Sequence, residues 1–106
     1  MSPDEQEITV TKNEAKHRYE AQVGGHLAVL TYERQGDTII YLHTGVPSAV
    51  AGRGIANLLA RTALDEARAE QQSVVPLCSF IAVYIRRHPE YLPLVSESQR
   101  AQFQHS

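Results

Sequence analysis

The sequence predicts an α+β domain in which two main helices pack on a mixed sheet. The sheet combines an antiparallel meander with one parallel strand pair. Three observations lead to this prediction: alternating polar and apolar runs broken by glycine-containing turns, then one long amphipathic segment, then a short apolar run. A strand, a helix and another strand in one sheet give a parallel pair, because the helix carries the chain back along the sheet.

The first half of the chain predicts four strands. Residues 18–23 and 26–34 alternate between polar and apolar on either side of Gly24-Gly25. Two such runs joined by two glycines predict a hairpin, because both turn residues can adopt positive φ. The other strands are expected around residues 8–10 and, after a turn at 35–37, at residues 38–44.

The second half predicts two helices and one more strand. From Gly54 onward, apolar residues recur at helical spacing with charged residues on the opposite side, which indicates a long amphipathic helix. Residues 74–78 predict a buried strand, and Pro76 should make it an edge strand or leave it locally unpaired, because proline has no backbone donor. A short helix at residues 80–87 follows, with Ser79 as its expected cap.

Composition narrows the class of protein. The chain has 106 residues and 11.8 kDa, so we expect one domain with residues 1–7 and 96–106 at its periphery. A net charge of -2 argues against a nucleic-acid partner, and no apolar stretch approaches the roughly 20 residues of a membrane span.

The single cysteine, Cys78, fits a reducing compartment, and no histidine has metal-ligand spacing with it. We therefore expect a cytoplasmic monomer or weak dimer without a metal.

The glycine-rich segment 46–56 carries the clearest chemical signal. It opens the long helix, with Gly52 and Gly54 on either side of Arg53. Backbone N–H groups at a helix start, freed of side-chain bulk, form an anion site, and an arginine adds positive charge. A Walker loop is excluded because no Gly-Lys pair is followed by Ser or Thr, and a dinucleotide fingerprint because Asn57 stands where the third glycine belongs. A tight turn that binds nothing remains the alternative.

Three motifs in a fixed order resemble the minimal GCN5-related N-acetyltransferases between Ala21 and Val95. The first runs from His43-Thr-Gly-Val-Pro-Ser through Gly52-Arg-Gly-Ile-Ala56, and the others are Pro76-Leu-Cys-Ser-Phe80 and Tyr84-Ile-Arg-Arg-His-Pro-Glu-Tyr91. The resemblance implies an antiparallel sheet followed by a parallel strand pair that splays apart around the pantetheine arm of acetyl-CoA, the co-substrate.

The family's loop pattern is Gln or Arg, two residues, Gly, one residue, then Gly or Ala. Gly54 and Ala56 fit this pattern, whereas Ala51 stands at its first position and removes one side chain from the cofactor site. The resemblance implies a cofactor site made of Val46, Gly52, Arg53, Gly54, Ile55, Ala56 and Tyr84.

Acetyl transfer from a thioester to an amine needs a base for the amine proton. His43 lies at a strand end, and period-two counting places it on the face of Ile39 and Tyr41. Cys78 ends the next strand just before a helix start, whose partial positive charge favours a thiolate. It could accept the acetyl group, line the cleft beside the thioester, or be a small buried apolar residue. If the two strands are neighbours, His43 and Cys78 form a candidate Cys/His pair.

The leading functional hypothesis is an acetyl-CoA-dependent N-acetyltransferase that acts on a small amine or an exposed protein amine. The alternatives are a non-catalytic module that binds CoA or acyl-CoA, which Ala51 favours, and a purely structural domain. Arg86, Arg87 and His88 close the second helix. They either complement its negative end or contact an acidic group of the cofactor or a partner.

Overall fold

The computed structural model describes residues 8–96, so the expectations for residues 1–7 and 97–106 lie outside the described part of the chain. Five strands and two α-helices follow one another there in the predicted order: β1 (Val10–Asn13), β2 (Arg18–Val23), β3 (His26–Gln35), β4 (Thr38–Gly45), α1 (Ile55–Ala69), β5 (Ser73–Pro76) and α2 (Ser79–Arg87). No helix within residues 8–96 is long and apolar enough to cross a membrane.

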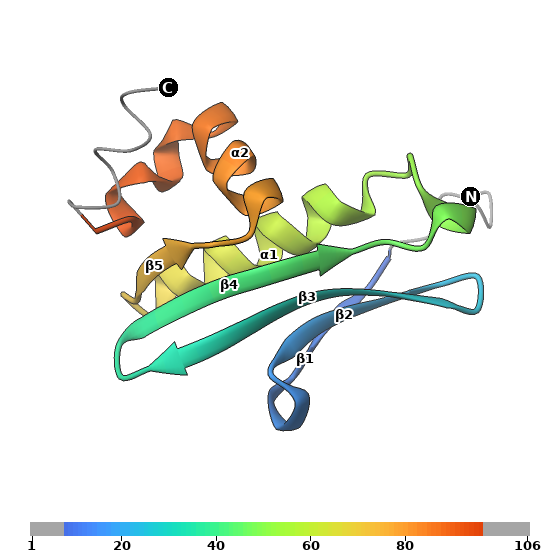
Figure 1. Ribbon diagram of the computed structural model, residues 1–106, viewed down its shortest axis with the longest axis horizontal. Helices are drawn as coiled ribbons and strands as arrows, with labels where there is room; N and C mark the ends of the chain where they lie inside the picture. Colours follow the sequence, from blue (N-terminus) through green and yellow to red (C-terminus); the bar gives the residue numbers. More distant parts are fainter. Residues whose placement is uncertain (1–7, 97–106) are drawn as a thin grey trace.

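The strands form one sheet in the order β1-β2-β3-β4-β5, and Figure 1 shows the meander of β1 to β4 with β5 at its edge. The first three pairs are antiparallel and the last is parallel. Val23 pairs with His26 across Gly24 and Gly25, whose φ angles are +54° and +80°, so the predicted two-residue hairpin turn is present. The predicted α+β fold with a mixed sheet and two main helices is confirmed.

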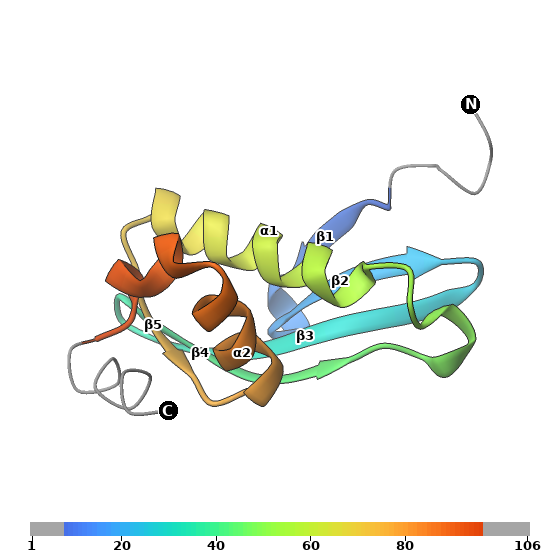
Figure 2. The ribbon, with the colours of Figure 1, turned by 90° about the horizontal axis from the view of Figure 1, so that it is seen from above.

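One helical layer builds the core. Helix α1 runs along one face of the sheet, and α2 packs beside it against β4 and β5 (Figure 2). The buried face of the sheet, here called the helix face, includes Leu30, Tyr32 and Tyr41, and the opposite face is called the outer face. The Tyr41 hydroxyl donates a hydrogen bond to the Ala63 carbonyl of α1 at 3.1 Å. This bond gives a buried phenol the partner that it needs.

A β-bulge interrupts the pairing of β3 with β4. Tyr32 pairs with Tyr41, but the preceding residue, Thr31, pairs with His43, so Leu42 is an extra residue in β4. Residues opposite each other in a ladder point to the same face. His43 therefore lies with Thr31 on the outer face, and the predicted placement of His43 on the face of Tyr41 is wrong.

The parallel pair is short. It runs from Thr38 opposite Ser73 to Tyr41 opposite Pro76, and β4 then continues to Gly45 without β5 beside it. Pro76 thus ends an edge strand where the two strands stop pairing, which confirms the position predicted for a residue without a backbone donor.

Candidate functional site

The loop between β4 and α1 needs glycine at two positions. Gly52 and Gly54 have φ angles of +84° and +75°, and a Cβ atom at either would meet nothing within 4 Å. The requirement is therefore conformational, because L side chains rarely adopt this backbone region. Buried Val50 anchors the preceding turn of 3₁₀ helix, and the glycine segment after it is exposed.

The start of α1 is open to an anion. Gly54 is its N-cap, no side chain caps it, and no acidic residue lies in the first turn. The first helical hydrogen bond runs from the Leu58 N–H to the Gly54 carbonyl at 3.0 Å. The N–H groups of Ile55, Ala56 and Asn57 therefore have no acceptor inside the helix and point out of its positive end.

A cavity of about 220 Å³, here called the loop cavity, adjoins this helix start. It is lined by Val46, Ala51, Gly52, Gly54, Ile55, Ala56, Asn57 and Phe80. Five of the predicted cofactor residues line it, whereas the side chain of Arg53 does not and is exposed. Phe80 comes from α2, and its contribution depends on tertiary packing that local spacing does not reveal.

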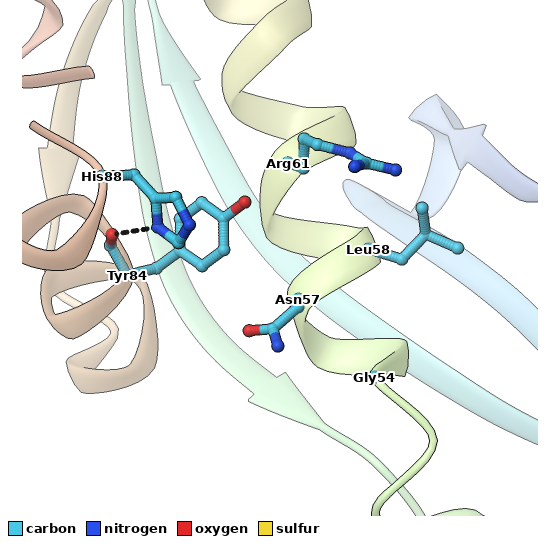
Figure 3. A pocket seen from close by; sticks show the side chains of 6 residues that line it. All are labelled: Gly54, Asn57, Leu58, Arg61, Tyr84 and His88. Atoms are coloured by element: carbon cyan, nitrogen blue, oxygen red, sulfur yellow. Dashed lines mark hydrogen bonds between the residues drawn. The ribbon is translucent and has the colours of Figure 1, made fainter. Parts of the chain in front are cut away.

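A second cavity of about 390 Å³, here called the interhelix cavity, lies between α1 and α2 (Figure 3). It is lined by Gly54, Asn57, Leu58, Arg61, Tyr84 and His88. Gly54 and Asn57 line both cavities, so the two adjoin. Tyr84, predicted at the cofactor site, lies in the interhelix cavity instead of the loop cavity.

Two stacked rings form the α2 wall of the interhelix cavity. The centroids of Tyr84 and His88 are 4.1 Å apart and the ring planes differ by 18°. The Nδ1 atom of His88 lies 3.0 Å from the Tyr84 carbonyl, which can only accept, so Nδ1 carries the hydrogen. Burial raises the pKa of the Tyr84 hydroxyl, although the charge of Arg61 opposes the shift.

Cys78 lies where β5 turns into α2. It is the N-cap of the helix and is 5% exposed, and its N–H donates to the Tyr41 carbonyl at 2.8 Å. The helix therefore begins at Ser79, which was predicted to be the cap. The Sγ atom of Cys78 lies 3.2 Å from the Oγ1 atom of Thr44. Thr44 faces the helices because it pairs with Leu30 beyond the bulge.

The structure does not bring His43 and Cys78 together as a Cys/His pair. His43 is exposed on the outer face, whereas Cys78 and Thr44 meet on the helix face. Strand counting missed Thr44 because the bulge, which depends on cross-strand pairing, moves it to the helix face. His43 and Cys78 thus lie on opposite sides of the sheet. Both can reach the same reacting group only beyond the point where β4 and β5 stop pairing, because the paired strands would otherwise separate them.

The basic residues that close α2 have the positions expected from its polarity. Arg86 and Arg87 lie in its last turn, where positive charge complements the negative end of the helix dipole. Within residues 8–96, no three His, Cys, Asp or Glu side chains are grouped so that they could hold a metal ion.

An antiparallel meander, a parallel pair that separates and a glycine loop at a helix start define the class of protein. The chain belongs to the GCN5-related N-acetyltransferase family, whose sequence profile matches residues 18–94. Among its relatives, protein NATD1 from Homo sapiens is 36% identical over 85 residues, which cover 77% of this chain and 75% of that protein. Protein NATD1 from Mus musculus is also 36% identical over 85 residues, with 77% of each chain covered.

The fold also matches a solved structure. It is the NMR solution structure of a GCN5-like candidate N-acetyltransferase from Staphylococcus aureus, with a TM-score of 0.66. The match covers 84% of this chain and 88% of that one. At 20% sequence identity it supports the shared fold alone.

Proposed function

We propose that this protein transfers an acetyl group from acetyl-CoA to the amine of a small molecule or of an exposed protein residue. One observation carries the proposal. The glycine loop and Cys78 follow the carboxyl ends of the adjacent parallel strands β4 and β5, at the point where these strands stop pairing. Sites in sheets with parallel strands commonly form at such carboxyl ends.

The residues of the loop fit the cofactor that the family uses. The free N–H groups of residues 55–57, the absence of an acidic residue in the first turn of α1 and the charge of Arg53 all favour the pyrophosphate of CoA. Val46 and Phe80 give the loop cavity apolar walls suited to a pantetheine arm. When bound, acetyl-CoA supplies an acyl carbon activated by a thiol leaving group.

We assign Cys78 to the reacting end of the site and His43 to the side of the amine. A new bond forms between the amine nitrogen and the acyl carbon, the carbon–sulfur bond breaks with its electron pair on the CoA sulfur, which leaves as the thiolate, and the nitrogen loses a proton. His43 on the outer face takes that proton from an amine that approaches between the separated strands. The Cys78 thiol lies beside the Thr44 hydroxyl. It either accepts the acetyl group first, with its proton passing to the CoA sulfur that leaves, and then gives the group to the amine, or it lines the position of the acetyl group.

A binding module without turnover is the second candidate function. Ala51 lines the loop cavity at the position where the family pattern has Gln or Arg, so the loop has one polar side chain fewer for the pyrophosphate. Such a module would bind CoA and acetyl-CoA alike and leave the thioester intact.

The decisive experiment combines calorimetry with CoA and mass spectrometry of the protein after incubation with acetyl-CoA and a panel of amines. We expect CoA binding, amine acetylation, and a Cys78→Ala variant that loses far more transfer rate than CoA affinity, because a nucleophile acts on the transition state. If the Cys78→Ala variant transfers acetyl groups normally, the amine attacks directly and Cys78 has a packing role. CoA binding by the wild-type protein with no transfer to any amine would establish the binding module.

A further inference from the structure

We propose that the acceptor of this protein is a small monoamine with an apolar body, and that Leu42 and Leu77 bind this body beside His43. The inference rests on the proposed function, because it assigns a class of amine to the same site. It adds a specificity that His43 and Cys78 do not supply, since both act on the reacting groups alone.

The outer face of the sheet changes from polar to apolar between its two edges. Over β1 and β2 it carries the polar side chains of Thr11, Asn13, Arg18, Glu20 and Gln22. Over β4 and β5 it carries Ile40 and Val75, which pair with each other and are half-buried. Both α-helices of residues 8–96 pack on the helix face (Figure 2), so neither covers these two side chains. Because a sheet face turned toward water is usually polar, the apolar half indicates a binding surface.

Each strand of the parallel pair has a leucine outside the ladder where the pairing stops. Leu42 is the extra residue of the bulge in β4. On the β5 side, the Leu77 N–H donates to the Val75 carbonyl at 3.2 Å in a three-residue turn. The next N–H, that of Cys78, donates to the Tyr41 carbonyl at 2.8 Å. The two leucines are the direct chain neighbours of the residues in this contact, so both lie where β4 and β5 separate (Figure 1).

Both leucines are exposed, Leu42 to 39% and Leu77 to 64%. Among residues 8–96, the other exposed large apolar side chain is Val83 of α2. A single exposed apolar residue is ordinary, but these two lie two residues further along each strand than Ile40 and Val75. The four side chains, here called the apolar patch, gain free energy when an apolar ligand removes them from water.

His43 lies beside the apolar patch, and its ring extends away from it. A Cβ atom at Gly45 would lie 3.4 Å from the Nε2 atom of His43 and 3.9 Å from a methyl carbon of Val29. The ring therefore reaches over Gly45, which follows Leu42 by three residues, about 10 Å of extended strand. An amine beside Nε2 can contact the leucines only through a body several carbons long.

The charged groups near the apolar patch favour one amine over two. The Glu20 carboxylate accepts hydrogen bonds from Arg18 at 2.6 Å and from Asn13 at 3.1 Å, so it already has partners. Glu33 pairs with Ile40 and is exposed, which makes it the carboxylate that could hold a second ammonium. Against it, an ammonium that is placed on apolar side chains loses hydration without gaining a partner. We therefore expect a monoamine, and the experiment tests Glu33 directly.

The test compares kcat/KM for hexylamine and 1,5-diaminopentane with acetyl-CoA, at about 0.15 M salt to screen long-range charge effects. The two chains have the same length, and the terminal methyl group of the first is an ammonium in the second. Leu77→Glu and Leu42→Glu each place a carboxylate in the apolar patch, one on either strand. Val83→Glu makes the same change at an exposed apolar residue of α2 and is the matched control. Glu33→Gln removes the carboxylate that could hold a second ammonium.

We expect the wild-type protein, Val83→Glu and Glu33→Gln to prefer hexylamine by about tenfold, the effect of burying roughly two methylene groups. Both leucine variants should lose this preference, because the new carboxylate attracts the second ammonium and repels an apolar body. Circular dichroism and calorimetry with CoA check that each variant folds and keeps its cofactor affinity.

Four results would overturn the inference and leave the proposed function standing. The wild-type protein could acetylate both amines equally or prefer the diamine, it could acetylate other amines and neither of these two, both leucine variants could keep the preference, or Val83→Glu could lose it as well. If the wild-type protein acetylates no amine at all, the proposed function fails and the inference with it.

Discussion

The Glu66 carboxylate of α1 is the meeting point of side chains from the first two strands. Lys12 of β1 lies 2.7 Å from it, and the Tyr19 hydroxyl of β2 donates a hydrogen bond to the same oxygen. The Lys12 ammonium also lies 5.6 Å from the Tyr19 ring centroid and 5.7 Å from that of Tyr32. Burial raises the pKa of Glu66, but the hydrogen bonds from Lys12 and Tyr19 outweigh it and the net pKa is lowered.

This arrangement predicts an acid-dependent loss of stability. A carboxyl group with a lowered folded-state pKa stabilises the fold at neutral pH, and the stabilisation is lost as the pH falls through that pKa. Glu66→Gln should reduce the drop in unfolding free energy between pH 7 and pH 3 by on the order of 1 kcal/mol, since the side chain is 34% exposed and partly screened. Urea titrations at several pH values measure it, and the exposed Glu33→Gln serves as control. A drop equal to that of the wild type would contradict the assignment.

The position of His43 predicts a split between binding and turnover. Because its ring lies on the outer face, away from the helices, His43→Ala should leave CoA affinity unchanged. It should lower turnover by roughly 10²-fold or more, because a general base contributes about 10²–10⁴-fold. His26→Ala, which changes an exposed histidine at the first residue of β3, is the control. Full activity of His43→Ala would place the base elsewhere.

Local sequence predicted some of these residues and not others. Cys78 could be placed because a strand end and a helix start stand beside it in the chain. The pairing of Tyr19 with Glu66 joins residues 47 positions apart, and nothing local to either indicates the other. His43 was assigned to the wrong face because one extra residue inverts every later side chain in a strand.

At the scale of the element, the start of α1 is unusual. Helices usually begin with a Ser, Thr, Asp or Asn whose side chain satisfies an N–H group, and substituting such a cap by alanine costs about 1 kcal/mol. Here the N-cap is Gly54, whose backbone is in the left-handed region, and no side chain accepts a hydrogen bond from the first N–H groups of the helix. The helix therefore forgoes a stabilising contact, and the same N–H groups remain available to an anion.

This feature predicts that Gly54→Asp blocks the cofactor. CoA should raise the melting temperature of the wild-type protein by mass action, and the shift should disappear in the variant because a carboxylate would stand where the phosphates bind. The control is Gly36→Asp. That glycine has a φ of +61° and open space around it, so the backbone strain is similar, but it lies at the opposite end of β4. An equal CoA-induced shift in both variants would move the site away from this loop.

The elements and the direction in which their strands pair were largely predictable, and the register between β3 and β4 was not. Glycine-containing turns and alternation place β2, β3 and β4, and helical spacing places α1, because these signals are local. The bulge at Leu42 has no such signal, since it arises from how β3 and β4 meet. For the same reason the interhelix cavity, which needs α1 and α2 in contact, was not predicted.

At the scale of the molecule, a single core between the sheet and its helices carries the stability. Leu64 of α1 is fully buried, and Leu64→Ala should lower the unfolding free energy by about 2–5 kcal/mol. That is a large share of the roughly 5–15 kcal/mol typical of a domain. Leu77→Ala removes the same atoms from a residue that is 64% exposed and should cost far less. Urea unfolding measures both, and similar losses would show that the two residues are not packed as described.

Because of the extra residue at Leu42, nearby side chains of β4 face both sides of the sheet. Tyr41 is committed to the helices and His43 to the opposite side, although a regular strand would point both the same way. Under the proposed function, substitutions at outer-face positions beside His43, such as Thr31, would change which amine is accepted and leave the residues that bind the cofactor unchanged. A laboratory library confined to that face would sample new amine preferences with the core residues untouched.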